Sequence, residues 1–229
     1  MKSIFNYFLA IFIVGLTTHP VQADTFLYTT PDFDPANPWH VSNWYVDGLG
    51  EPRAQAIGQT FKTPNSTDTV LTEFSYWVQE LDGVHVTLDA VLMEWDLIGR
   101  KPIGAQLYTS NPYTTSDNSG LAGYEKVTFN VGNIQLDRSK SYVAILSTEN
   151  YENGAPSRLG IGWSGSDRYL DGEWYFYDSG IWGTAFYSDY AFEARFTAQP
   201  VPEPETYAMM LAGLALVGAM ARRGKQAKV

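Results

Sequence analysis

Alternating apolar and polar residues, separated by turn-forming clusters, constrain the fold of this chain more than any other feature. Along residues 84–93 apolar side chains recur at every second position, which is the period of a strand with one buried face. Residues 74–78 and 126–131 alternate in the same way. Clusters such as Ser110-Asn111-Pro112 lie between such runs, and residues of these types favour turns. Helical periodicity is almost absent from this part of the chain, so we expect an all-β fold.

The spacing of the strand candidates predicts a specific architecture for residues 24–198. Residues 142–146 and 192–196 add two further runs of aromatic and β-branched character. Strands of this number and spacing predict an antiparallel two-sheet β-sandwich, jelly-roll-like in its connections, with one core of ordinary domain size. A closed β-barrel is the structural alternative.

The N-terminus has the pattern of a secretory signal peptide over residues 1–23. Lys2 supplies a positive start, residues 4–16 are mostly apolar, and Val21-Gln22-Ala23 forms a small-residue cleavage site. We therefore expect export through the Sec translocon, with cleavage before Asp24. A permanent N-terminal membrane helix is disfavoured because the apolar stretch is short.

The C-terminus contains a second apolar segment with different flanks. A Pro-rich linker at residues 199–205 leads into a predicted transmembrane helix at residues 206–221, and a basic tail follows at residues 222–229. The 17 residues from 205 to 221 would extend about 25 Å as a helix, just enough for a bilayer core of roughly 30 Å. The basic side chains after the segment favour a cytoplasmic C-terminus. These topology-determining residues are Arg222, Arg223 and Lys225.

Read residue by residue, this tail resembles the PEP-CTERM sorting signal of exported bacterial proteins. Pro202, Glu203 and Pro204 match the family's motif, residues 209–220 match its helix rich in Leu and small residues, and Arg222-Arg223 matches its basic stop. The two prolines also hold the backbone extended, in a form that a processing enzyme could grip. The alternative is a plain Pro-rich linker before an ordinary anchor.

The resemblance covers about an eighth of the chain and implies a partner. It implies recognition by an exosortase, a membrane-embedded protease and transpeptidase of bacteria that usually also make exopolysaccharide. The catalytic residues of that reaction would belong to the exosortase. We therefore expect transient anchoring in the inner membrane with the domain on the periplasmic side, then residence in the cell envelope or extracellular matrix.

Charge and composition exclude several classes of function for the central domain. The whole chain carries a net charge of −10, and residues 24–198 carry −13, because the leader has one base and the tail has four bases and two acids. An acidic surface argues against nucleic acid and anionic membranes as partners, whereas neutral glycans and divalent cations are compatible with it. The chain has no cysteine, which excludes disulfides, thiol nucleophiles and Cys-based metal sites.

A dense set of aromatic residues lies between positions 163 and 190. Trp163, Trp174 and Trp182 are the candidate glycan-binding residues, because flat aromatic rings pack against the apolar faces of sugars. Packing inside the sandwich is the plainer interpretation of the same residues. If Trp174 and Tyr175 share a strand, they point to opposite faces, so only part of this set can bind a ligand.

The end of the domain also has a sparse resemblance to known folds. Tyr169-Leu170-Asp171-Gly172, Trp182 and Asp189-Tyr190-Ala191-Phe192 are similar to the closing strands of jelly-roll domains in secreted bacterial proteins, including some carbohydrate-binding modules. The resemblance implies the fold more than a ligand.

Metal and catalytic sites have little support in the sequence. Asp167 and Asp171 lie beside glycines, as loop ligands of calcium do, but without EF-hand spacing, and solvated loop charges are the favoured interpretation of both. Neither His40 nor His85 has a metal-binding or catalytic spacing. We therefore expect no catalytic residues and no cofactor, with calcium at Asp167 and Asp171 as the alternative.

These features combine into one interpretation with two alternatives. We expect an exported, non-catalytic β-sandwich that an exosortase sorts, with glycan binding, for instance to exopolysaccharide, as its molecular role. One alternative is a purely structural matrix component. The other is a polysaccharide hydrolase or lyase, which would need a concave sheet with clustered acids or His85 beside a tyrosine.

Overall fold

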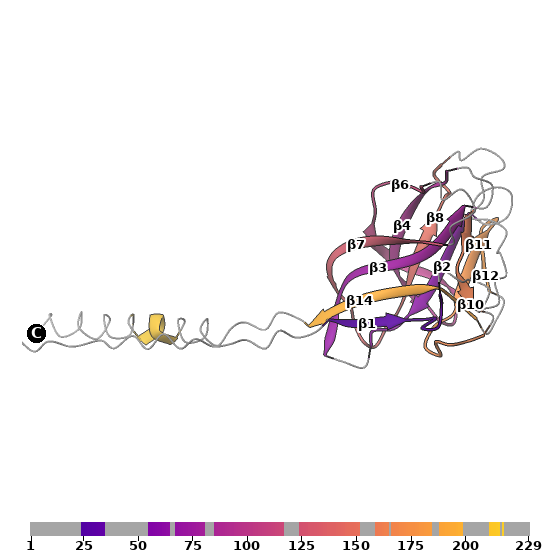
Figure 1. Cartoon of the computed structure of the whole chain (residues 1–229). Coiled ribbons are helices and arrows are strands. Elements are labelled where there is room, and N and C mark those ends of the chain that lie inside the picture. The colour runs from indigo at the N-terminus through magenta and orange to yellow at the C-terminus, as the bar shows by residue number, and fades with distance from the viewer. Residues whose placement is uncertain are drawn as a thin grey trace, which may run out of the picture.

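The computed structural model describes residues 24–34, 55–64, 67–80, 85–116, 124–151, 159–164, 166–184, 188–198, 211–215 and 217. Within these residues the domain consists of β-strands joined by turns and loops (Figure 1). The strands are β1 (Thr25–Tyr28), β2 (Ala56–Phe61), β3 (Asp68–Glu80), β4 (Thr87–Asp96), β5 (Lys101–Thr109), β6 (Tyr113–Thr114), β7 (Glu125–Gln135), β8 (Ser141–Ser147), β9 (Leu159–Ile161), β10 (Trp163–Ser164), β11 (Trp174–Asp178), β12 (Ile181–Gly183), β13 (Asp189–Tyr190) and β14 (Phe192–Ala198).

The strands form two main sheets and one small one. The five-stranded sheet has the order β1-β14-β3-β7, with β9 pairing the end of β3. The seven-stranded sheet has the order β12-β11-β2-β8-β4-β5, with β6 pairing the start of β4, and β10 pairs β13 separately. All of these pairings are antiparallel, as the alternating sequence pattern predicted. The all-β, antiparallel prediction is therefore confirmed.

The connections between the sheets follow the order of a jelly roll. Counted along the chain, the eight main strands are β1, β2, β3, β4, β5, β7, β8 and β14. They occur as first, eighth, third and sixth in one sheet, and as second, seventh, fourth and fifth in the other. The hairpin of β11 and β12 is an addition between the last two main strands, and it extends the larger sheet beyond β2. Each sheet keeps its own edge strands in the described residues, so the architecture is a sandwich and not a closed barrel.

Aromatic rings from the facing sheets meet in the core. Phe61 on β2 lies 5.4 Å from Phe192 and 6.4 Å from Phe196 on β14, measured between ring centroids. Phe74 on β3 lies 6.2 Å from Tyr108 on β5. Burial of such side chains is the main stabilising contribution, at about 2 kcal/mol for each fully buried ring. This chain has no cysteine, so burial replaces the disulfides common in exported domains.

A buried phenol joins the two sheets by hydrogen bonds. The Tyr76 hydroxyl on β3 accepts from the Gln59 backbone N–H at 2.9 Å and donates to the Ala144 carbonyl at 2.6 Å. Gln59 and Ala144 are paired positions of β2 and β8 in the opposite sheet. Burial raises the pKa of Tyr76 far above its ordinary value, so the phenol stays a neutral donor and acceptor.

The alternating pattern of residues 84–93 predicted the core-facing positions correctly, but the prediction of a solvated opposite face was wrong at Val91. Val86, Leu88, Ala90 and Leu92 are all buried, as predicted. The alternate positions were expected to face solvent, yet Val91 is only 8% exposed. It belongs to a second apolar cluster on the far side of the seven-stranded sheet.

The C-terminal segment is described only in part. Residues 211–215 and 217 are helical, and their large side chains are exposed. Within the described residues, no helix has the length and hydropathy that a membrane span requires. The rest of the predicted helix lies outside the described residues, as do the signal peptide, the linker with Pro202, Glu203 and Pro204, and the basic residues Arg222, Arg223 and Lys225.

Candidate functional site

The face of the seven-stranded sheet that points away from the core carries its own apolar cluster. Six of its members are buried: Ala56, Val91, Trp95, Val143, Ile145 and Tyr175. Three partly buried side chains pack against them: Met93, Tyr177 and Trp182. We call these nine residues the outer cluster. An antiparallel sheet usually presents a polar face to water, so an aromatic layer on this side needs a reason.

The strand register explains how residues distant in sequence meet in this cluster. Tyr177 on β11 is paired with Trp182 on β12 and with Ala56 on β2. Val91 on β4 is paired with Ile145 on β8. Directly opposed residues of antiparallel strands project on the same face, so these pairings build a continuous layer across neighbouring strands.

A glycine in the middle of the sheet makes room for the aromatic rings. Gly58 on β2 is paired with Tyr175, and a Cβ at this position would lie 2.7 Å from Val143 Cγ2. With no side chain there, the Tyr175 ring reaches a centroid distance of 4.4 Å from Trp95. Trp182 then lies 5.7 Å from Trp95 and 5.3 Å from Tyr177. Burial is also the main cause that raises the pKa of Tyr175 to about 12.

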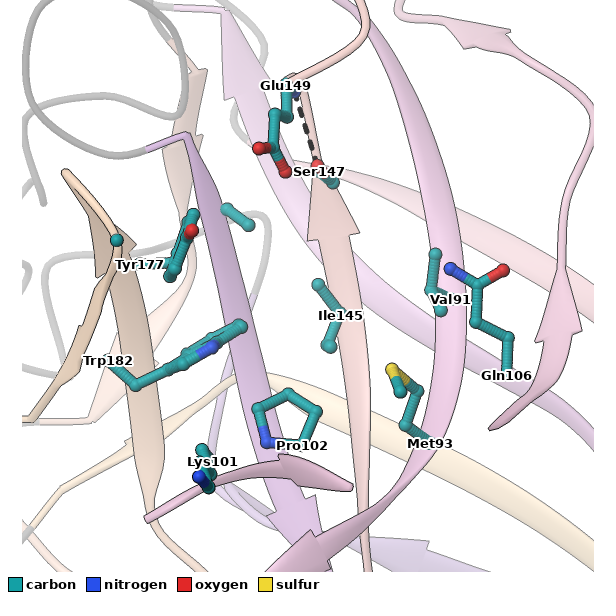
Figure 2. A pocket seen from close by; sticks show the side chains of 12 residues that line it. Val91, Met93, Lys101, Pro102, Gln106, Ile145, Ser147, Glu149, Tyr177 and Trp182 are labelled. Carbon is teal, nitrogen blue, oxygen red and sulfur yellow. Dashed lines mark hydrogen bonds between the residues drawn. The ribbon is translucent and has the colours of Figure 1, made fainter. Parts of the chain in front are cut away.

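A groove of about 410 Å³ lies over this cluster, and we call it the outer groove. Figure 2 shows Tyr177 and Trp182 on one side, Val91, Met93 and Ile145 along the floor, and Gln106 on the opposite side. Its polar lining comes from Lys101, Gln106, Ser147 and Glu149. The volume falls in the range of ligand sites, and the mixture of aromatic surface with a few polar groups is typical of them.

Local hydrogen bonds position the polar side chains of the outer groove. Gln106 Oε1 accepts from the Thr109 hydroxyl at 2.7 Å, which orients the amide on the bulged part of β5. Ser147 Oγ accepts from the Glu149 backbone N–H at 3.2 Å (Figure 2). These contacts orient the Ser147 hydroxyl and the Gln106 amide beside an aromatic surface.

A buried acid lies beside Ser147, one of the residues that line the outer groove. Asp89, paired with Ser147, accepts hydrogen bonds from the Tyr151 hydroxyl and, at 3.4 Å, from Asn150 Nδ2. The hydrogen bond to Asp89 is the main cause that raises the pKa of Tyr151 to about 12. The phenol therefore remains protonated at neutral pH and acts as a donor to the acid.

The three predicted tryptophans lie in three different environments. Trp182 lines the outer groove. Trp174 is only 5% exposed, packs in the sandwich core and donates from Nε1 to the Ser188 hydroxyl. Trp163 is half-buried against the same core, with its ring 6.2 Å from that of Trp174. The predicted set therefore does not form one surface, and Trp174 is removed from the ligand-binding candidates because its ring faces inward.

Several groove residues were missed by sequence reasoning. Val91 and Met93 were assigned to a solvated face, and the polar residues Gln106 and Ser147 were not singled out. A usable signal was present in residues 142–146, which are apolar on both faces of the strand and so indicate a second covered surface.

The predicted calcium ligands are not brought together into a metal site. Asp171 forms an exposed ion pair with Lys62 at 3.0 Å. Asp167 raises the pKa of the nearby Asp189, although burial is the largest cause of that rise, to about 6. In the part of the chain that the structure describes, no group of three or more acidic or histidine side chains is arranged to hold a metal ion. Calcium binding through Asp167 and Asp171 remains a prediction.

The histidine that a catalytic interpretation would need lies away from the outer groove. His85 precedes β4, its side chain is 57% exposed, and its Nδ1 lies 3.3 Å from Glu80 Oε1. His40 lies outside the described residues.

Comparisons with known proteins identify the C-terminal motif. Residues 200–225 match the family model of the PEP-CTERM protein-sorting motif, which confirms the resemblance found in the sequence. The chain thus carries a sorting motif that indicates an exported, exosortase-sorted protein. No curated protein matched the chain.

The domain has a distant structural neighbour. It is similar to the crystal structure of the cysteine protease and lectin-like domains of Cwp84, a surface layer associated protein of Clostridium difficile. The identity is 10% and the TM-score is 0.41, with 64% of this chain and 33% of that chain covered. The chain therefore spans about a third of that neighbour's length.

Proposed function

We propose that this protein is a non-catalytic envelope or matrix component whose jelly roll binds a glycan in the outer groove. The single observation that carries the proposal is the aromatic layer on the sheet face turned away from the core. Tyr177 and Trp182 are only partly buried there, and they line the same groove as the polar groups of Gln106 and Ser147. Sugar rings offer an apolar face for such aromatic rings and hydroxyls for such polar groups.

The delivery of the domain follows from the two ends of the chain. The signal peptide at residues 1–23 directs the chain to the Sec translocon, and residues 206–221 hold it in the inner membrane with the domain on the periplasmic side. An exosortase then processes the chain near Pro202, Glu203 and Pro204. Mass spectrometry of the mature protein from its own bacterium tests this step, and we expect a C-terminus before residue 206. An intact end at Val229 would contradict processing.

Glycan binding is tested by affinity electrophoresis of the full-length protein in gels that contain the exopolysaccharide of the producing bacterium. We expect retention by the polysaccharide, with at least a tenfold weaker apparent affinity after Trp182→Ala or Tyr177→Ala. Such a loss corresponds to about 1.4 kcal/mol, a reasonable value for one ring in contact with a ligand.

A matched control separates groove binding from general surface effects. Phe26 on β1 is 43% exposed but belongs to the other sheet, so Phe26→Ala should leave retention unchanged. Equal retention of the parent and the Trp182→Ala protein would contradict glycan binding in the groove. It would favour the purely structural alternative, in which the outer cluster only shields the sheet.

Enzymatic action on the polysaccharide is tested with the same preparation. We expect no new reducing ends and no unsaturated products after prolonged incubation. Their appearance would favour the hydrolase or lyase alternative.

A further inference from the structure

We infer that the outer groove holds an internal stretch of an uncharged polysaccharide chain, laid across the strands of the sheet. This inference rests on the proposed glycan binding and adds three properties to it. They are the direction of the chain, the need for several consecutive sugar units, and the rejection of polyanionic chains.

The direction comes from the strands that supply the lining. Groove residues lie on six strands that are neighbours in the sheet, from Trp182 on β12 to Gln106 on β5. Neighbouring strands are about 4.8 Å apart, so the lining extends about 24 Å across the sheet. This length exceeds a single sugar ring, which would contact only a fraction of the lining.

The ends of the groove favour an internal stretch over a chain terminus. Among the described residues, β12 and β5 are the outermost strands of the seven-stranded sheet. Trp182 and Gln106 thus lie at opposite edges, and a polymer seated between them can continue past both. A site for a chain end would instead need a wall across one end of the groove.

The charges around the groove disfavour polyanions. Lys101 and Glu149 both line it, and Figure 2 shows them on opposite sides of the groove, Glu149 near the top and Lys101 near the bottom of the view. The single base is therefore offset by an acid, and the buried Asp89 adds a second acid beside Ser147. The domain as a whole carries −13, so its long-range field also repels negative chains. Hydroxyl groups on a neutral sugar can form hydrogen bonds with the Ser147 hydroxyl and the Gln106 amide without this electrostatic repulsion.

The experiment compares neutral and anionic polymers on the full-length protein in detergent at low salt. Dextran, xyloglucan and galactomannan serve as neutral probes, and alginate and hyaluronan serve as anionic probes, in affinity gels. We expect retention by at least one neutral polymer, none by the anionic polymers, and loss of retention after Trp182→Ala but not after Phe26→Ala. Oligosaccharides of the retained polymer then compete for the site, and we expect the monosaccharide to be at least 100-fold weaker than the longest oligomer.

The outcomes distinguish this inference from the proposed function. Retention by alginate or hyaluronan alone, abolished by Trp182→Ala, would overturn the uncharged ligand while keeping glycan binding. A monosaccharide that competes as well as the oligomers would overturn the extended, internal mode of binding. Retention by no polymer in the panel, nor by the exopolysaccharide of the producing bacterium, would overturn both.

Discussion

The two faces of the seven-stranded sheet are both apolar, but different partners cover them. On the inner face, Trp174 packs against Trp163 and Tyr190 of the small β10-β13 sheet and Leu146 lies in the main core, and both Trp174 and Leu146 are at most 5% exposed. On the outer face, the described residues include no second sheet, and Tyr177 and Trp182 are only partly buried. Trp174 is therefore enclosed by protein on the inner face, whereas Tyr177 and Trp182 keep part of their surface free on the outer face.

This difference separates stability from binding within one sheet. A ring that is enclosed by protein stabilises the folded state through the burial of its whole apolar surface. A ring covered on one side contributes less, but its free face can contact a ligand. Trp174 and Tyr177 on β11 show how strand geometry assigns these roles, because positions an odd number of residues apart on a strand project to opposite faces.

The sharpest test of the comparison is a pair of tryptophan substitutions. Trp174→Ala should lower the free energy of unfolding by about 4 kcal/mol, because it opens a cavity in the core and leaves the Ser188 hydroxyl without the Nε1 donor. Trp182→Ala should cost only about 1 kcal/mol, because its ring is partly solvated. Urea denaturation followed by tryptophan fluorescence measures both values. Equal costs for the two substitutions would remove the distinction between the faces.

A buried acid on the inner side should give the domain a pH-dependent stability. Burial raises the pKa of Asp189 to about 6, even though Gln59 Nε2 and the backbone N–H groups of Arg168 and Tyr169 all donate to its carboxylate at 2.9 Å. The folded state therefore binds a proton more tightly than the unfolded state. Its stabilising contribution is complete below about pH 4 and is lost as the pH rises through 6, by about 3 kcal/mol in total.

The variant Asp189→Asn isolates this contribution. The difference in unfolding free energy between parent and variant should fall between pH 4 and pH 6 and stay constant above pH 7. The absolute stability of the variant should also drop, because its amide nitrogen would face Gln59 Nε2. A difference that is flat or rises over this interval would contradict the raised pKa.

The sandwich could be predicted from the sequence because each core strand has an alternating pattern that can be recognised within its own residues. Phe74, Tyr76 and Val78 are buried at every second position, so the period of the strand is visible in the chain itself. The C-terminal motif could be recognised for a similar reason, since its Pro-Glu-Pro segment, apolar run and basic end follow one another directly.

The outer groove could not be predicted because its residues meet only through pairings between distant segments. Tyr177 is opposite Ala56, and Val91 is opposite Ile145, and neither pairing can be read from local periodicity. The tryptophans illustrate the same limit. A tryptophan side chain suits either a hydrophobic core or a sugar-binding surface. Only the register of β11 and β12 within the sheet directs Trp174 inward and Trp182 outward.

The smallest expected effect concerns Gly58, which lies beneath the outer cluster. In Gly58→Ala the new methyl group would lie 2.7 Å from Val143 Cγ2 and 3.2 Å from the Ala144 carbonyl oxygen, so Val143 or the strand must shift. We expect a loss of about 1 kcal/mol in the free energy of unfolding, because overpacking outweighs the lower entropy of the unfolded chain. Tyr175 is opposite Gly58, so the displaced ring should also weaken polysaccharide retention severalfold. Gly180→Ala, at an exposed turn with φ of 89°, is the comparison, since it strains the backbone without touching Val143. If the Gly58→Ala protein were as stable as the parent and were held by the polysaccharide as strongly, the outer cluster would not depend on the space above this glycine.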